Sequence, residues 1–500
     1  GAANVAIGDR ALQTNTGSNN IVAVGYKALE LNTATSNTAC GSNALDANTT
    51  GTQNNAFGHN ALGSNTTASY NNAFGEQSLA NNTTGSDNNA FGHRTLQLNT
   101  TGTLNTAVGG NALDANTTGD SNVAVGNNAL GANTTANENT AIGYGALDAN
   151  TTANHNVAVG YGGLGANTTG TQNTAVGTYA LQTASTSSTN AAFGYSSLKV
   201  NTASHNSAFG ANSLAANTTG SENCVFGYNS SRQSTTASKN AAFGWRALDA
   251  CTTGGYNTAV GNSALYANTT GTNNVAVGNN ALVAHTTGYE NTAIGSRAGD
   301  QLTDGYRNCF MGEDAGDDVT TGSNNMAFGL DAGRAGTPTG SITTASNYIC
   351  MGNNSHTDFA CRVSLTVTSD KRDKTDITDF TKGLDWIKAL RPVTYRWDRR
   401  TWYGTDEKPY GTPDGSKKRN QLHIGFLAQE ALEVEKTNGY GSSKDDMLIV
   451  NLNEDDMSYG MKYERLVPVL VNALKELSTK IDTLETENTA LKARVTTLEG

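Results

Sequence analysis

The 500-residue sequence lacks a long hydrophobic run, a basic block and a paired-cysteine motif. No stretch approaches 18 consecutive apolar residues, so the sequence predicts no membrane-spanning helix. The net charge is −11 and only 15 % of residues are charged, which argues against a nucleic-acid-binding protein. We therefore expect neither membrane insertion nor binding to nucleic acid.

The six cysteines are scattered, and none belongs to a Cys-x-x-Cys pair. We therefore expect no disulfide framework, no metal site and no cofactor, which fits assembly in a reducing cytoplasm. Cys40 and Cys350 replace apolar residues of a repeated motif, so we interpret them as small buried hydrophobic residues.

Charge is distributed unevenly along the chain. Residues 1–353 contain 10 Lys or Arg and 19 Asp or Glu, whereas the much shorter segment 354–500 contains 22 and 24. This difference predicts two physically distinct regions that are joined near 354–368. We expect a repeat shaft at 1–353, a connecting strand at 354–368, a small α+β domain at 369–465 and a C-terminal coiled coil at 466–500.

A motif Asn-x-Ala-Z-Gly, in which Z is usually Val, Ile or Phe, recurs through the first region. Its glycine first appears at Gly8 and last at Gly352, and 17 of the 20 spacings are 17 residues. The full unit reads Asn-x-Ala-Z-Gly-x-x-Ala-Leu-x-x-Asn-Thr-Thr-Gly-x-x, as in 122–138. This length is too short for a helical repeat. It predicts a coil with two short strands, one at Asn-x-Ala-Z and one around Ala-Leu, and two turns.

Stacked coils would place each strand about 4.8 Å from its copy and would align the asparagines into hydrogen-bonded ladders. We expect the nearly constant Ala to lie in a cramped place and the variable Z residue to fill the core. The Leu four residues after the motif glycine is replaced by glycine at Gly299, Gly316 and Gly333, so the coil cross-section should change there. Because the core of one coil is thin, we expect a homotrimer.

Two other interpretations of the repeat carry less weight. Asn-Thr-Thr matches the N-glycosylation sequon at Asn48, Asn167 and elsewhere, but the same residues are typical of turns. The turns rich in Asn and Asp could also bind Ca²⁺, but they lack the dense Asp spacing of calcium-binding repeats.

The repeat resembles the head repeats of trimeric autotransporter adhesins and the repeats of many phage tail fibres, over residues 4–352. The resemblance implies a mainly β fold, a trimeric parallel β-solenoid or β-roll shaft. It leaves the ligand open, because a fold does not fix a function.

The second region shows the patterns of a small mixed domain. Residues 379–390 have apolar residues at helical spacing. A strand is predicted at 393–397, a polar loop at 404–421, and a strand turning into a helix near Ala428 at 424–430.

The end of the chain follows a heptad pattern. Its a positions are Val467, Leu474, Ile481, Asn488 and Val495, and its d positions are Leu470, Leu477, Leu484, Leu491 and Leu498. Five heptads favour a parallel coiled coil over a helix that packs only on its own domain.

Several blocks of this region resemble the intramolecular chaperone domain of endosialidase-type tailspikes. They are Ser-Asp-x-Arg-x-Lys from Ser369, Gly-Leu-Asp-Trp-Ile-Lys-Ala-Leu-Arg-Pro-Val-Thr-Tyr-Arg-Trp from 383, Gly-Phe-Leu-Ala-Gln-Glu from 425, Tyr463 and the terminal heptads. The resemblance implies a domain that trimerises a fibre and then cuts itself off.

By the same resemblance, Ser369 is the nucleophile, Lys374 is the base, and Thr368–Ser369 is the scissile bond. Asp370 and Arg372 would shape the site. The chemistry is consistent, since a serine needs a nearby base and a desolvated lysine can supply one. The reaction would be a single autoproteolytic turnover with no external substrate.

We therefore expect a viral tail or host-attachment fibre, assembled in the host cytoplasm and present in the virion. Its expected partners are two further copies of the chain, a host surface receptor or glycan, and other virion proteins through a missing N-terminus. A bacterial adhesin, a depolymerase tailspike and a membrane-bound transcription factor are the alternatives. The irregular segment Asp331–Ser346 is either a binding loop or, as we favour, an adaptor at the end of the shaft.

Overall fold

The computed structural model describes residues 2–335, 337, 339–353, 355–356, 367–405, 408, 410–453 and 456–500. These residues form two compact units, Gly1–Met311 and Gly312–Gly500. The connecting strand predicted at 354–368 lies mostly outside the described residues, since only 355, 356, 367 and 368 of that range are described.

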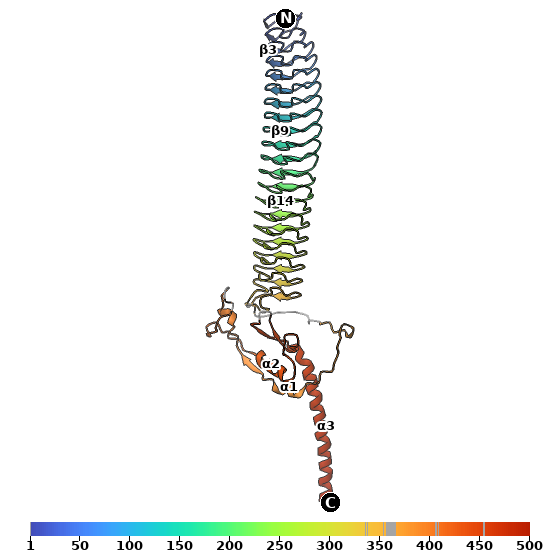
Figure 1. The fold of residues 1–500 in the computed structure, drawn as a ribbon, viewed down its shortest axis with the longest axis vertical. Helices are drawn as coiled ribbons and strands as arrows, with labels where there is room; N and C mark the ends of the chain where they lie inside the picture. The colour runs from blue at the N-terminus through green and yellow to red at the C-terminus, as the bar shows by residue number, and fades with distance from the viewer. Residues whose placement is uncertain are drawn as a thin grey trace. The chain divides into compact units, whose positions relative to one another are not determined.

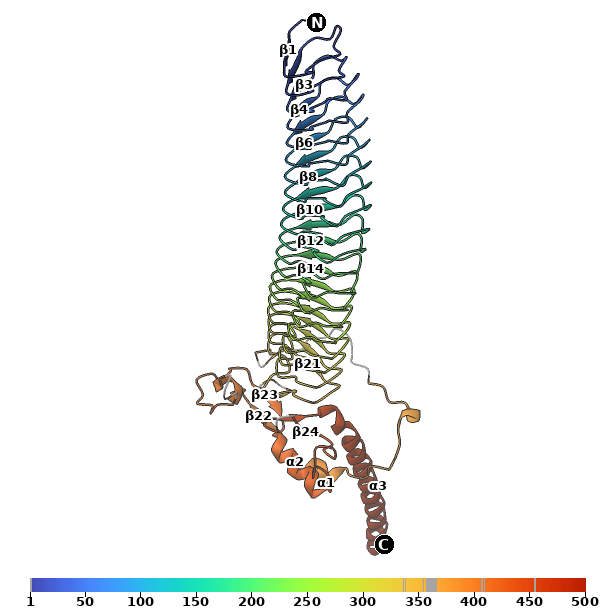
Figure 2. The same cartoon turned by 45° about the horizontal axis from the view of Figure 1, so that its top comes forward.

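The first unit is a β-solenoid in which each coil contributes one short strand (Figure 1). The strands stack in chain order, each on the next (Figure 2). They are β1 (Asn4–Ile7), β2 (Ile21–Val24), β3 (Thr38–Cys40), β4 (Asn55–Phe57), β5 (Asn72–Phe74), β6 (Asn89–Phe91), β7 (Thr106–Val108), β8 (Val123–Val125), β9 (Thr140–Ile142), β10 (Val157–Val159), β11 (Thr174–Val176), β12 (Ala191–Phe193), β13 (Ser207–Phe209), β14 (Cys224–Phe226), β15 (Ala241–Phe243), β16 (Thr258–Val260), β17 (Val275–Val277), β18 (Thr292–Ile294) and β19 (Cys309–Met311).

Neighbouring strands pair in parallel at the repeat spacing. In β8 and β9, Val123 pairs with Thr140 and Ala124 with Ala141. The motif glycine is required by this close stacking. Gly126 has φ +137°, and a Cβ atom on it would lie 2.5 Å from the carbonyl oxygen of Gly143. Residues that carry a side chain rarely adopt that backbone conformation, so only glycine fits at the end of the strand.

The buried asparagines form the predicted ladders. In the first ladder, Asn122 donates its side-chain Nδ2 to the Ala136 carbonyl (2.8 Å) and its Oδ1 accepts the N–H of Asn139 (3.0 Å). In the second ladder, Asn133 Nδ2 donates to Asn116 Oδ1 (2.8 Å). The sequon residues Asn48 and Asn167 belong to this second ladder and are fully buried, so both serve as turn residues of the folded coil.

The second strand predicted around Ala-Leu is wrong, because no strand forms there in the described coils. The backbone instead has positive φ at alternate residues, as at Asn128 (57°) and Leu130 (52°). Asn128 then donates its N–H to the carbonyl of Gly110 in the previous coil, and Leu130 donates to Ala146 in the next coil. The Leu130 side chain is fully buried, so the turn satisfies its backbone and fills the core at the same time.

The Z residue is also not the core filler that we expected. The Ala before it, such as Ala124, is fully buried, whereas Z points outward, because successive residues of a strand face opposite sides. Phe57, Phe91 and Val108 are 37–40 % exposed. We call the Z residues the outer apolar row. Cys40 belongs to it and is exposed, which corrects its assignment as a buried residue, whereas Cys350 is buried as expected.

The cross-section changes near the end of the first unit, as predicted. At Gly299 the Leu of the repeat is missing, and a Cβ atom there would lie 2.6 Å from the ring of Phe310. Phe310 replaces the usual Ala of the next strand and is fully buried. The large and small side chains have therefore exchanged positions, and the core volume is kept.

The second unit begins with two further strands of the repeat, β20 (Met326–Phe328) and β21 (Ile349–Met351), which pair in parallel. A small α+β domain follows in the sequence. Its elements are η1 (Lys371–Asp373), α1 (Leu384–Ala389), β22 (Val393–Tyr395), η2 (Arg400–Tyr403), β23 (His423–Gly425), α2 (Ala428–Thr437), β24 (Val450–Leu452), β25 (Tyr459–Met461), η3 (Tyr463–Arg465) and α3 (Leu466–Glu499). β22 pairs antiparallel with β23, and β24 with β25.

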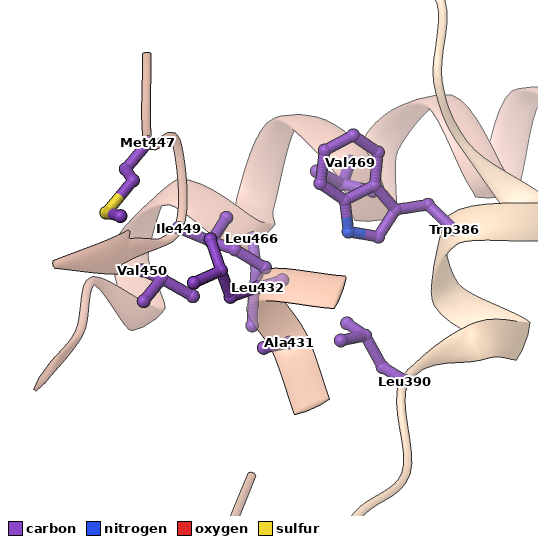
Figure 3. Close-up of a cluster of buried hydrophobic side chains, with 9 residues drawn as sticks. All are labelled: Trp386, Leu390, Ala431, Leu432, Met447, Ile449, Val450, Leu466 and Val469. Carbon is purple, nitrogen blue, oxygen red and sulfur yellow. The ribbon is translucent and has the colours of Figure 1, made fainter. Parts of the chain in front are cut away.

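The core of this domain joins its three helices (Figure 3). Trp386 of α1 is 1 % exposed and lies near Val469 of α3. The cluster consists of Trp386, Leu390, Ala431, Leu432, Met447, Ile449, Val450, Leu466 and Val469. The first turns of α3 therefore belong to the domain. None of the described helices is both long and apolar enough to cross a membrane.

The rest of α3 leaves its heptad stripe uncovered. Leu474 is 66 % exposed, Leu484 is 62 % exposed and Leu498 is 85 % exposed. Leu466, Val469 and Ala473 are the buried residues of α3, and they lie on a different face from the heptad positions. The interpretation in which the stripe packs on its own domain is therefore wrong for the described residues.

Candidate functional site

The predicted nucleophile and base come together in a tight turn at the start of the domain. Lys374 directly follows the single turn of η1, and its Nζ donates a hydrogen bond of 2.5 Å to the Ser369 hydroxyl oxygen. The Lys374 N–H donates to the carbonyl of Lys371, which closes the turn. The five-residue spacing in the sequence therefore becomes a direct contact.

The two supporting residues pair with each other. Asp370 is the N-cap of η1, and its carboxylate accepts the backbone N–H of Arg372 at 2.9 Å. The Arg372 guanidinium also donates to both oxygens of the same carboxylate, from Nε at 3.1 Å and from Nη2 at 2.5 Å. This pair shapes the turn that returns Lys374 toward Ser369, and none of its hydrogen bonds reaches the hydroxyl.

The charges of the turn follow from this pairing. Hydrogen bonds from the side chain and the backbone N–H of Arg372 lower the pKa of Asp370 below its ordinary value. The same contact raises the pKa of the Arg372 guanidinium. Both groups are therefore ionised at neutral pH, and the turn keeps its shape over the physiological range.

The site is open to solvent in the single chain. Thr368, Ser369 and Lys374 are all exposed. A lysine ammonium has three donors and no acceptor, so the observed contact is one in which Lys374 donates to the hydroxyl. To take a proton from Ser369, the amine must be neutral, and desolvation is what favours the neutral form. The turn therefore brings Ser369 and Lys374 into contact, but it does not shield Lys374 from water.

Two polar residues that hold the domain together were missed by the sequence analysis. Glu435 is fully buried, and its carboxylate accepts the backbone N–H groups of Leu448 (3.0 Å), Ile449 (2.5 Å) and Val450 (2.9 Å). Glu476 of α3 accepts the N–H of Leu384 at the start of α1 (3.0 Å). The sequence signal for Glu435 was its place four residues after the buried Ala431, on the apolar face of α2.

The described part of the chain contains no group of three or more His, Cys, Asp or Glu side chains that could hold a metal ion.

Residues 369–440 match the model of the family described as chaperone of endosialidase. Together with the long solenoid of 17-residue coils, this match fits the class of tailspikes and fibres that carry a C-terminal chaperone domain. The match begins at Ser369 and includes Lys374, α1, β22, β23 and α2, and it ends before β24 and α3. No curated protein matches the chain.

Proposed function

We propose that the chain is a subunit of a viral tailspike or tail fibre whose C-terminal domain aligns three chains and is then released by autoproteolysis. The observation that carries the proposal is the contact between Lys374 Nζ and Ser369 Oγ, at the first residue of the matched family segment. A fibre of this kind would assemble in the host cytoplasm and remain on the virion.

The proposed reaction needs only groups of the chain and water. Ser369 Oγ attacks the carbonyl carbon of Thr368 while Lys374 takes the hydroxyl proton. The C–N bond then breaks, the Ser369 nitrogen receives a proton, and an ester joins Thr368 to the Ser369 oxygen. Water hydrolyses this ester, which leaves a Thr368 carboxylate and a fragment that begins with the free amine of Ser369.

Two exposed apolar surfaces support assembly from several chains. The heptad stripe of α3 would be buried by parallel helices, as in other coiled coils. The outer apolar row of the solenoid includes stacked pairs such as Phe57 with Phe74, whose ring centroids lie 4.6 Å apart. A continuous apolar row on a folded surface is typical of an interface. A homotrimer would bury each of these surfaces against its copies in the other chains.

Assembly would also provide the missing desolvation. Because Ser369 and Lys374 are exposed in the single chain, we expect a neighbouring chain to cover them before the reaction. Cleavage would then follow trimerisation. Release of the domain would remove the easiest route back to separate chains and leave the shaft kinetically trapped.

The test is to express residues 1–500 and to follow denaturing electrophoresis and intact mass. We expect the wild-type chain to yield a fragment that spans 369–500. Ser369→Ala and Lys374→Ala should both abolish it, a loss of at least about 10³-fold in rate, because each removes an essential group. Lys371→Ala is the matched control, since it changes an exposed lysine of the same turn and should leave cleavage intact. A wild-type chain that stays whole while trimeric would refute the autoproteolysis.

A further inference from the structure

One patch of the solenoid departs from its polar, charge-poor repeat. Arg232, Lys239 and Arg246 are three of the only 10 Lys and Arg residues in 1–353, and they lie within one coil length of each other. Trp245 is the only tryptophan of that region. We call Tyr228, Arg232, Trp245, Arg246, Asp249 and Tyr266 the aromatic–arginine patch.

A buried carboxylate organises the patch. Asp249 is fully buried, and its two oxygens accept from Arg232 Nε at 3.1 Å and from Arg246 Nε at 3.0 Å. Two guanidinium groups thus share one carboxylate, so the cluster keeps a net positive charge on an acidic chain. The buried Asp249 carboxylate fixes the orientation of both guanidinium groups. The side chains of Arg232 and Arg246 nevertheless remain 40 % and 30 % exposed.

Aromatic rings surround these cations. The Arg246 guanidinium lies 5.1 Å from the ring centroid of Trp245 and 4.4 Å from that of Tyr266. Trp245 is 46 % exposed, and Tyr228, which occupies the same place in the previous coil, is 51 % exposed. The patch therefore presents flat apolar rings beside fixed guanidinium groups.

The coil itself does not require these residues. The place of Asp249 and Tyr266, five residues after the motif glycine, is held by Gly131 and Gly165 in other coils. The place of Trp245 is held by Gly110 in another coil. Aspartate also recurs at the place of Asp249, as Asp46, Asp114 and Asp148, so the patch is set apart by the two arginines paired with that aspartate and by its tryptophan.

We propose that the aromatic–arginine patch binds a glycan that carries carboxylate or sulfate groups. A sugar ring offers an apolar face to an aromatic ring, and guanidinium groups pair with carboxylate or sulfate oxygens through parallel N–H bonds. The patch spans three coils, about 10–15 Å at the spacing of adjacent strands. That length fits a short oligosaccharide and is small for a stable protein interface, which buries roughly 1,200–2,000 Å².

The biological meaning of this site rests on the proposal that the chain is a tailspike or tail fibre, but its test does not depend on autoproteolysis. The intact chain is immobilised, and four probes are applied at 150 mM salt: alginate, dextran sulfate, neutral dextran and polyglutamate. We expect alginate or dextran sulfate to bind, and the one that binds identifies the acid group. Neutral dextran and polyglutamate should bind at least tenfold more weakly.

Matched variants locate the binding. Trp245→Ala and Arg246→Lys should each raise the Kd of the bound glycan at least tenfold, whereas Trp245→Phe should keep most of the affinity. The controls are Tyr161→Ala and Arg94→Ala, which occupy the same coil positions outside the patch and should change the Kd less than twofold. Circular dichroism checks that each variant is folded.

Three results would overturn the proposal: no binding of either acidic glycan, equal binding of polyglutamate, or equal losses in the control variants. None of these results bears on the release of residues 369–500. A failure of glycan binding and a failure of autoproteolysis are therefore distinguishable.

Discussion

At the scale of single residues, the asparagine ladders show how an almost uncharged chain fills its interior with polar groups. Asn122 uses its amide as both donor and acceptor, so its side chain and the backbone groups of two coils are satisfied together. An aspartate there could not donate, and an alanine would leave buried partners without bonds. Where the second ladder is interrupted, Cys251 takes the place of asparagine and donates its thiol to the Gly254 carbonyl at 3.2 Å. Burial raises the pKa of Cys251 to about 12, so it stays a neutral thiol.

His285 also occupies an asparagine position, and this makes one coil sensitive to acid. Its Nδ1 lies 2.9 Å from the Thr303 carbonyl and its Nε2 lies 3.2 Å from Asn291 Nδ2, so the neutral ring donates at Nδ1 and accepts at Nε2. Burial lowers the pKa of His285, although the carbonyl contacts and the nearby Asp304 oppose this shift. Protonation of His285 would add a hydrogen at Nε2, which would then face the Nδ2 amide hydrogens of Asn291.

We therefore expect the coil around His285 to lose stability as the pH falls below about 6.5. The unfolded chain takes up a proton there before the folded chain does, so the stability is present above the unfolded pKa and is lost toward the lower folded pKa. Hydrogen exchange of the Thr286 N–H, corrected for its intrinsic rate, should report faster opening at acidic pH. His285→Asn restores the residue of the repeat and should remove this dependence. An unchanged dependence in that variant would assign the effect to another group.

At the scale of elements, the sequence predicted the period of the solenoid and one of its two proposed strands. The strand before the motif glycine was predictable because its Asn and Ala recur with the glycine. The turn around Leu130 was not, because leucine rarely adopts a positive φ and its identity indicates only burial. The outward direction of the outer apolar row was missed for a related reason. A recurring apolar residue in a sequence does not reveal whether its side chain faces the core of its own chain or the surface.

The helix α3 has one apolar face buried in its own domain and one exposed apolar face, and this leads to a mutational prediction. If α3 forms the proposed coiled coil, Leu477→Asp combined with Leu484→Asp should convert the proposed trimer into monomers, because charged residues at d positions destabilise a coiled coil. Ser369→Ala is added so that the helix stays attached. Light scattering of the purified protein gives the mass.

Thr479→Asp combined with Thr486→Asp is the control. These residues have the same spacing on the same helix, are exposed, and lie away from the a and d positions. This variant should keep the trimer. A trimer that survives the leucine substitutions would remove α3 from the assembly interface.

The candidate site was predictable only as a set of residues. Ser369 and Lys374 follow from the sequence blocks around them, and their contact depends on the cap that Asp370 and Arg372 form. The exposure of Ser369 and Lys374 could not be predicted, because it depends on which parts of the folded protein lie over residues 368–374. No local pattern in one chain contains that information.

At the scale of the whole molecule, a solenoid whose coils contact only their neighbours should tolerate a change of length by whole coils. Deletion of residues 122–138 would place β7 beside β9, with Ala107 opposite Ala141 in an unchanged register. We expect the shortened chain to fold, to release the same 369–500 fragment, and to unfold within about 3 °C of the full-length chain. Circular dichroism and intact mass test this.

The control is a deletion of residues 130–138, which removes only part of a coil. It takes away Leu130 and Asn133 but keeps β8, so the ladders and the core lose their alignment. This shorter deletion should cost far more stability than the longer one. Equal effects of the two deletions would show that the coil is not the cooperative unit.

The direction of the hydrogen bonds has a mechanical consequence. The strand-to-strand bonds of β1 to β19 connect one coil to the next, so a pull between the two ends of the first unit loads successive coils in series. The weakest junction opens first, and each coil that comes away adds on the order of 60 Å of extended chain. Under a sudden force, the first unit would dissipate energy by extending in steps of one coil. The opened coils would refold when the force is removed.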